Sequence, residues 1–154
     1  MKRRILFAIW FALLTAGIVH AQTACKWFTE GSAAALLNGP VTANSTLLPS
    51  SEGSCTFSLQ KDTTQYSLEI SVSNSAHGSC PPESQKLTGI GNEALLCKSS
   101  RSPGETVEEV NSRVRTTYFT VSLKIRGPSA SAMSPAKQQD LLQQVAEQVA
   151  GNLY

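Results

Sequence analysis

The sequence has few of the residues on which redox centres, metal sites and hydrolytic active sites are commonly built. Its 154 residues include two histidines, four cysteines and two tryptophans, and aromatic residues make up 6% of the chain. It contains no Cys-x-x-Cys pair, no haem-attachment motif and no Gly-x-Ser-x-Gly turn. It also lacks the repeats and biased tracts of collagen, coiled coils and disordered chains. What remains is a length and composition that suit one globular domain.

The first 21 residues have the pattern of a secretory signal peptide. A basic start (Lys2 to Arg4) precedes an apolar run (Ile5 to Val19), and Ala21 ends a cleavage motif of the small-residue type. The run is about 15 residues long, whereas a transmembrane helix needs about 20. We therefore expect residues 1–21 to be removed. Residues 22–154 then form a single exported domain, periplasmic or secreted, with no transmembrane segment.

Loss of this segment also removes the net positive charge. The chain has 13 Lys and Arg against 11 Asp and Glu, and the first 21 residues hold three of the basic residues and none of the acidic ones, which leaves 10 − 11 = −1. A charge so close to zero gives no reason to expect nucleic acid as a ligand. The expected partner is a protein or a small molecule, and the oligomeric state stays open.

The cysteines are Cys25, Cys55, Cys80 and Cys97. An even number in an exported chain predicts two disulfides, for which three pairings exist. We favour Cys25 with Cys55 and Cys80 with Cys97, and the second pair closes a loop of about 18 residues that contributes about 3 kcal/mol in the chain-entropy model. His77 and Cys80 offer only two candidate zinc ligands, so we expect no metal and no cofactor.

An alternative role of Cys25 is attachment of a lipid anchor. Thr23-Ala24-Cys25 matches the end of a bacterial lipoprotein motif, but Gln22 stands where that motif has leucine. We expect the unmodified exported form and keep an envelope lipoprotein anchored through Cys25 as the alternative.

Helices are predicted at both ends of the domain. Thr29 caps a short helix through residues 33–37, and Gly39-Pro40 after it ends that helix. Ser134 caps a long helix, opened by a proline, with apolar residues at every fourth position: Leu141, Val145, Val149 and Leu153. This apolar face is expected to pack on a sheet.

Four segments are predicted to be strands: 54–60, 65–73, 107–114 and 118–126. Apolar and polar residues alternate in the first two and in the last of them. The first two are joined as an antiparallel hairpin, in which Cys55 faces the core. Residues 41–53 and 99–104 are predicted to be exposed connections because they are rich in Ser, Thr, Asn, Pro and Gly. The predicted fold is therefore α+β, an antiparallel sheet flanked by a short N-terminal and a long C-terminal helix.

Candidate catalytic and nucleotide-binding residues are few. His77 is the only histidine after residue 21, so a Ser-His-acid hydrolase would have to use it, and a small secreted hydrolase is the alternative function. Glu108 and Glu109 are neighbours on a strand and point to opposite faces, so they cannot flank one glycosidic bond, and we expect both to be solvated. Gly89-x-Gly91-x-x-Ala94 formally matches a dinucleotide fingerprint, but no clear strand precedes it, and we expect a tight turn.

Four basic residues form a candidate binding patch: Arg113, Arg115, Lys124 and Arg126. The first two share one face of their strand and the last two share one face of the next strand, so hairpin pairing is expected to gather them. Carboxylates at Glu69, Glu108 and Glu109 can equally neutralise the patch, which would leave an ordinary solvated face.

Several motifs occur in the order of a known family. They are Cys25, the helix end from Ala34 to Val41, Ser54-Cys55-Thr56-Phe57, Leu87-Thr88-Gly89-Ile90-Gly91-Asn92-Glu93-Ala94, and the terminal helix from Leu141 to Leu153. This order resembles the DUF3558-like family of small bacterial secreted proteins and lipoproteins of unknown function. The resemblance implies a sheet flanked by helices similar to the Mog1 and PsbP-like domains, and it implies pairing of Cys25 with Cys55. Cys80 and Cys97 depart from the family pattern.

The resemblance brings no activity to this chain, and no set of convergent nucleophile, base and metal ligands is visible in the sequence. We therefore expect an exported, non-catalytic domain that acts as a binding or protein-interaction module in the cell envelope.

Intact mass of the protein exported by its native host tests the targeting and cysteine predictions together. The expected mass starts at Gln22, and four alkylated thiols appear only after reduction, because a disulfide sulfur does not react with an alkylating reagent. A start at Cys25 with added acyl mass, or thiols that react before reduction, would contradict both predictions.

Overall fold

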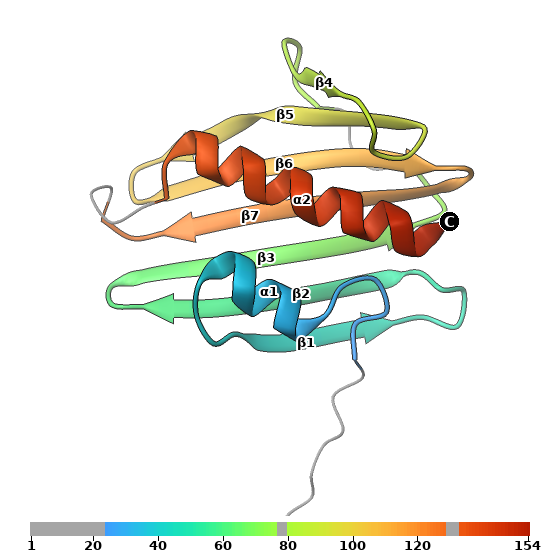
Figure 1. The fold of residues 1–154 in the computed structure, drawn as a ribbon. Coiled ribbons are helices and arrows are strands. Elements are labelled where there is room, and N and C mark those ends of the chain that lie inside the picture. Colours follow the sequence, from blue (N-terminus) through green and yellow to red (C-terminus); the bar gives the residue numbers. More distant parts are fainter. Residues whose placement is uncertain (1–23, 77–79, 129–132) are drawn as a thin grey trace, which may run out of the picture.

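Two antiparallel meanders join into a single sheet (Figure 1). The computed structural model describes residues 24–76, 80–128 and 133–154. In this part of the chain the sheet has seven strands in the order β1-β2-β3-β7-β6-β5-β4, and all neighbouring strands are antiparallel. The strands are β1 (Thr42–Leu47), β2 (Gly53–Lys61), β3 (Thr64–Ser73), β4 (Gln85–Leu87), β5 (Glu93–Ser102), β6 (Glu105–Val114) and β7 (Thr117–Arg126).

Both predicted helices are present, with the predicted caps. In α1 (Glu30–Leu37) the Thr29 hydroxyl accepts a hydrogen bond from the backbone N–H of Ser32, and Asn38 ends the helix in the left-handed conformation at φ 60°. In α2 (Pro135–Leu153) the Ser134 hydroxyl accepts from the backbone N–H of Lys137. The α+β class and the antiparallel sheet predicted from the sequence are therefore confirmed.

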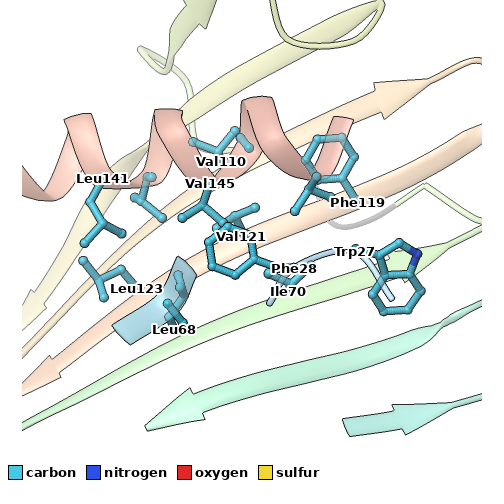
Figure 2. Close-up of a cluster of buried hydrophobic side chains, with 14 of the residues drawn as sticks. Trp27, Phe28, Leu68, Ile70, Val110, Phe119, Val121, Leu123, Leu141 and Val145 are labelled. Atoms are coloured by element: carbon cyan, nitrogen blue, oxygen red, sulfur yellow. The ribbon is translucent and has the colours of Figure 1, made fainter. Parts of the chain in front are cut away.

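The core lies between the sheet and the two helices, which cover the same face (Figure 1). Helix α2 packs on β6 and β7, and Figure 2 shows Leu141 and Val145 of this helix above Val121 and Leu123 of β7. Phe28, next to α1, meets Phe57 of β2 edge to face, with ring centroids 5.7 Å apart. All of these side chains except Leu141 are at most 2% exposed.

Two connections predicted from the sequence are wrong. Residues 42–47, which were expected to belong to an exposed connection, form the edge strand β1. The sequence shows no apolar alternation here because residues of β1 that face the helices, such as Ala43 and Ser45, are small and only half-buried. Strand β5 runs on to Ser102, past a register shift between Cys97 and Ser100, so the turn expected at 99–104 shrinks to its last two residues.

The prediction that Glu108 is solvated is also wrong. Glu108 is 2% exposed, because it lies on the same face of β6 as Val110 and Val114, which point toward the helices. Glu109 points to the other face, as expected for a neighbour on a strand. The apolar residues of β6, which are Val107, Val110 and Val114, do not alternate in the sequence, so only the structure shows that Glu108 lies on the inward face.

Both predicted disulfides are present. Cys25 is bonded to Cys55, with their Cα atoms 5.8 Å apart, and Cys80 is bonded to Cys97, with 5.1 Å between Cα atoms. A sulfur in a disulfide cannot at the same time form the thioether of a lipid anchor, so the Cys25–Cys55 bridge is the expected state of the unmodified exported form, and the lipid anchor stays an untested alternative. In the described part of the chain, neither helix combines the length and the apolarity that a membrane span requires.

Removal of the bridge between the N-terminal segment and β2 is expected to be costly. This bridge joins residues 30 positions apart. The Cys25→Ala/Cys55→Ala variant is expected to lose about 4 kcal/mol of unfolding free energy in urea denaturation, because the unfolded chain regains the entropy of that loop. The matched variant, Cys80→Ala/Cys97→Ala, removes the bridge that closes the shorter loop, and it is expected to lose about 3 kcal/mol of unfolding free energy. Wild-type stability in the first variant would contradict the prediction.

Candidate functional site

The face of the sheet opposite the helices, called the open face below, is polar. Along β2, β3 and β7 the buried residues point toward the helices, so the residues between them point to the open face. Most of these are short hydroxyl side chains: Ser54, Thr56, Ser58, Ser67, Ser71, Ser73, Thr120 and Ser122. Among the described residues, no helix packs on this side of the sheet (Figure 1).

The second disulfide closes one side of the open face. Cys97 and Asn111 lie on this face of β5 and β6, and the Asn111 amide donates to the sulfurs of both Cys80 and Cys97, at 3.5 and 3.3 Å. The carbonyl oxygen of the same amide accepts from the Thr120 hydroxyl at 2.6 Å. Since Cys80 belongs to the connection between β3 and β4, the bridge fastens that connection over β5. Away from this bridge, the open face is formed by β1, β2, β3 and β7 and by the ends of β6.

The four cations of the predicted patch do not gather. In the β6–β7 register Arg113 lies opposite Tyr118, whereas Arg126 lies opposite Glu105. Tyr118 and Arg126 are eight residues apart on β7, which is about 26 Å along a strand. The patch therefore divides into two pairs at opposite ends of the hairpin. The hairpin itself was predicted correctly. In an antiparallel hairpin, however, the end of β6 pairs with the start of β7, so cations near the end of β6 lie far from cations near the end of β7.

The pair Arg113 and Arg115 is engaged in structural contacts. The Arg113 guanidinium lies 3.4 Å from the Glu93 carboxylate and donates to the backbone carbonyl of Arg115 at 3.1 Å. The Arg115 guanidinium lies 5.6 Å from the ring centroid of Tyr154, a cation–π contact that ties the β6–β7 turn to the C-terminal end of α2. These two cations stabilise the local fold.

The other pair borders a depression on the open face, called the Lys124 hollow below. Its volume is about 180 Å³, and it is lined by Gln65, Ser67, Lys124 and Arg126. The β3–β7 register places Gln65 opposite Arg126 and Ser67 opposite Lys124, so the four side chains form two successive cross-strand pairs on one face. Sequence reasoning found the two cations but missed Gln65 and Ser67, because nothing local indicates that β3 pairs with β7.

One carboxylate holds Arg126 in place. The Arg126 Nε donates to the Glu105 carboxylate across the β6–β7 pair. This hydrogen bond, with further attraction from the Arg126 and Lys124 charges, holds the pKa of Glu105 below its ordinary value of 4.5, although partial desolvation opposes the shift. Lys124 itself forms no ion pair with any residue in the described part of the chain.

Two further cavities lie elsewhere among the described residues. One of about 410 Å³ lies between the β5–β6 turn, the end of β7 and the first turn of α2, and it is bordered by Glu105 and the buried Gln138, whose amide nitrogen donates to the carbonyl of Met133. The other, of about 210 Å³, lies between the start of α1 and the edge strand β1. Neither lining brings a histidine or a free thiol next to a hydroxyl, so neither has the composition of a hydrolytic site.

The remaining candidates from the sequence are placed as follows. His77 lies outside the described residues. Gly91 lies in a turn with φ 57°, and a Cβ at this position would lie 2.4 Å from the Arg113 carbonyl oxygen. The strand β5 follows this turn, so the predicted tight turn is confirmed. No three Asp, Glu, His or Cys side chains among the described residues gather closely enough to hold a metal ion.

Comparisons with known proteins leave the chain unassigned: no family model, no curated protein and no solved structure matches it. The resemblance to the DUF3558-like family therefore stays a prediction.

The Glu105–Arg126 pair leads to a pH prediction. A carboxyl pKa that is lowered by folding stabilises the folded state above about pH 4.5, and this contribution is lost as the pH falls through the lowered value. In Arg126→Gln we expect the pKa of Glu105, followed by NMR of its side-chain carboxyl carbon, to rise toward 4.5. Arg113→Gln, at the far end of the hairpin, is the control. An unchanged titration in Arg126→Gln would contradict the assignment.

Proposed function

We propose that this chain is an exported, non-catalytic binding module of the cell envelope and that the open face is its recognition surface. The observation that carries the proposal is the asymmetry of the sheet. One face is buried under α1 and α2, while the accessible part of the other face presents hydroxyl side chains in register across β2, β3 and β7.

Short hydroxyl side chains suit recognition for a thermodynamic reason. Each hydroxyl can donate one hydrogen bond and accept others. A serine or threonine side chain also has few rotamers to lose, so ordering it on binding costs less conformational entropy than ordering a lysine or glutamine. A surface of this kind forms many weak polar contacts with a partner while changing little itself.

The setting of these side chains also supports a binding role. They stand on central strands of a sheet rather than on loops, and strands hold side chains in fixed relative positions. The Cys25–Cys55 bridge ties the N-terminal segment to β2, and the Cys80–Cys97 bridge fixes the connection at the border of the open face. Disulfides of this kind persist in oxidising compartments, in agreement with a signal peptide and export.

The order of the motifs supports a place for the chain beside the DUF3558-like family, with a sheet of the Mog1 and PsbP-like kind. This part of the proposal rests on the resemblance of short motifs. It implies the same role, because the family resemblance brings no catalytic residues to the chain.

Photo-crosslinking in the native host tests the recognition surface. A photoreactive phenylalanine analogue at Thr56 or Ser71, on the open face, is expected to yield a discrete crosslinked product, because a bound partner lies within reach of these positions. The same analogue at Gln143 or Gln148, exposed on α2, is the matched control and is expected to yield none. Products from α2 alone, or none from either side of the sheet, would overturn the proposal.

A further inference from the structure

We propose that the Lys124 hollow binds a phosphodiester group, and that the ligand of the open face is a phosphodiester of a polyol or sugar. This inference rests on the proposed function, since it names the ligand class of the same surface. It is argued from the donors that line the hollow, from the local charge and from the hydroxyl groups beside it.

Every side chain that lines the hollow carries a hydrogen-bond donor. Lys124 supplies an ammonium group, Arg126 a guanidinium, Ser67 a hydroxyl and Gln65 an amide. No carboxylate lines it. Four donors on two neighbouring strands, around one depression of about 180 Å³, suit a compact acceptor with several oxygen atoms. An oxyanion meets this description, and hydrogen bonds to such an anion are charge-assisted.

The donors are partly arranged before any ligand arrives. Glu105 engages the Nε of Arg126, which fixes the guanidinium plane and leaves its terminal nitrogens as donors. Lys124 lies between Ser67 of β3 and Val107 of β6 in the register, so its stem is flanked on both sides. It is half-buried and has no ion pair with a described residue. Glu69, one position along the open face, is exposed and forms no ion pair with it.

The local charge distinguishes a phosphodiester from other anions. Among the lining side chains and the carboxylate paired with them, two cations and Glu105 leave one net positive charge, which matches a singly charged ligand rather than a phosphate monoester. A carboxylate is also singly charged, but it has two oxygen atoms in one plane, whereas a diester has four oxygen atoms around a tetrahedral phosphorus. A tetrahedral diester can instead contact donors from both strands.

Hydroxyl groups continue from the hollow across the sheet and indicate what flanks the phosphate. Ser58 of β2 lies opposite Ser67, which in turn lies opposite Lys124, so a row of two hydroxyls leads away from the ammonium group. A polyol or sugar attached to the diester would find hydrogen-bond partners along this row. Aromatic platforms, which stack nucleobases, do not line the hollow.

The test is an NMR titration of the purified protein at constant ionic strength with three probes: dimethyl phosphate, glycerophosphoglycerol and acetate. We expect saturable shifts of the backbone amides of Ser67, Lys124 and Arg126 with both diesters, and tighter binding of glycerophosphoglycerol because its hydroxyls reach Ser58. Ser58→Ala is expected to remove that advantage and leave dimethyl phosphate binding unchanged. Acetate is expected to bind more weakly than either diester.

Lys124→Gln is expected to weaken diester binding about tenfold, which is the effect of losing one charge-assisted hydrogen bond. Arg113→Gln removes the same charge from the same face of the sheet at the other end of the hairpin, and its affinity is expected to stay within about twofold of wild type. Unchanged amide signals from α2 in both variants show that the fold is intact.

Vesicles of phosphatidylglycerol form a further arm that identifies the source of the diester. Sedimentation of the wild type, but not of Lys124→Gln, with the vesicles assigns the group to a lipid headgroup, and absence of sedimentation assigns it to a soluble or polymeric polyol phosphate.

Shifts that do not saturate, or equal losses in Lys124→Gln and Arg113→Gln, would overturn the proposal, as would acetate binding as tightly as the diesters. Because the titration needs no native partner, its failure leaves the crosslinking result on the open face standing, and a failed crosslink leaves the titration standing.

Discussion

The pairing of β3 with β7 is the constraint on which the rest of the structure depends. It joins two meanders, β1-β2-β3 and β4-β5-β6-β7, that would otherwise be separate small sheets with exposed edges. The joined sheet is wide enough to carry both helices on one face, with Leu68 and Ile70 of β3 beside Val121 and Leu123 of β7 at its centre (Figure 2). The same register sets Ser67 next to Lys124 on the other face and so creates the Lys124 hollow.

The two faces of this sheet differ in what covers them and in their composition. Apolar side chains at alternate positions are removed from water under α1 and α2, which supplies the main favourable contribution to folding. The residues between these apolar positions point to the open face, where no described helix packs on them, and many of them are small hydroxyl residues. The disulfides follow the same division, since Cys25–Cys55 lies on the helix side, with Cys55 1% exposed, and Cys80–Cys97 borders the open face.

Local patterns predicted the elements well where a segment carries its own signal. Caps at Thr29 and Ser134 fixed the starts of both helices, and alternation in residues 65–73 and 118–126 predicted two of the central strands. The pattern failed at β1, where an edge strand needs little apolar surface, and at Glu108, where an acidic side chain occupies a buried position of an alternating strand. In both cases the position in the sheet outweighed the composition of the segment.

For the candidate site, the sequence by itself supplied the cations, the even number of cysteines and the prediction of export, because charge, thiol count and a terminal apolar run are properties of residues and not of their neighbours. Only the tertiary structure decided which cations are available. The antiparallel register carried Arg113 and Arg115 to the far end of the hairpin, into contacts with Glu93 and Tyr154, and brought Gln65 and Ser67 to Lys124 and Arg126. Residues about sixty positions apart meet through backbone hydrogen bonds between β3 and β7, and no local pattern encodes that choice of partner.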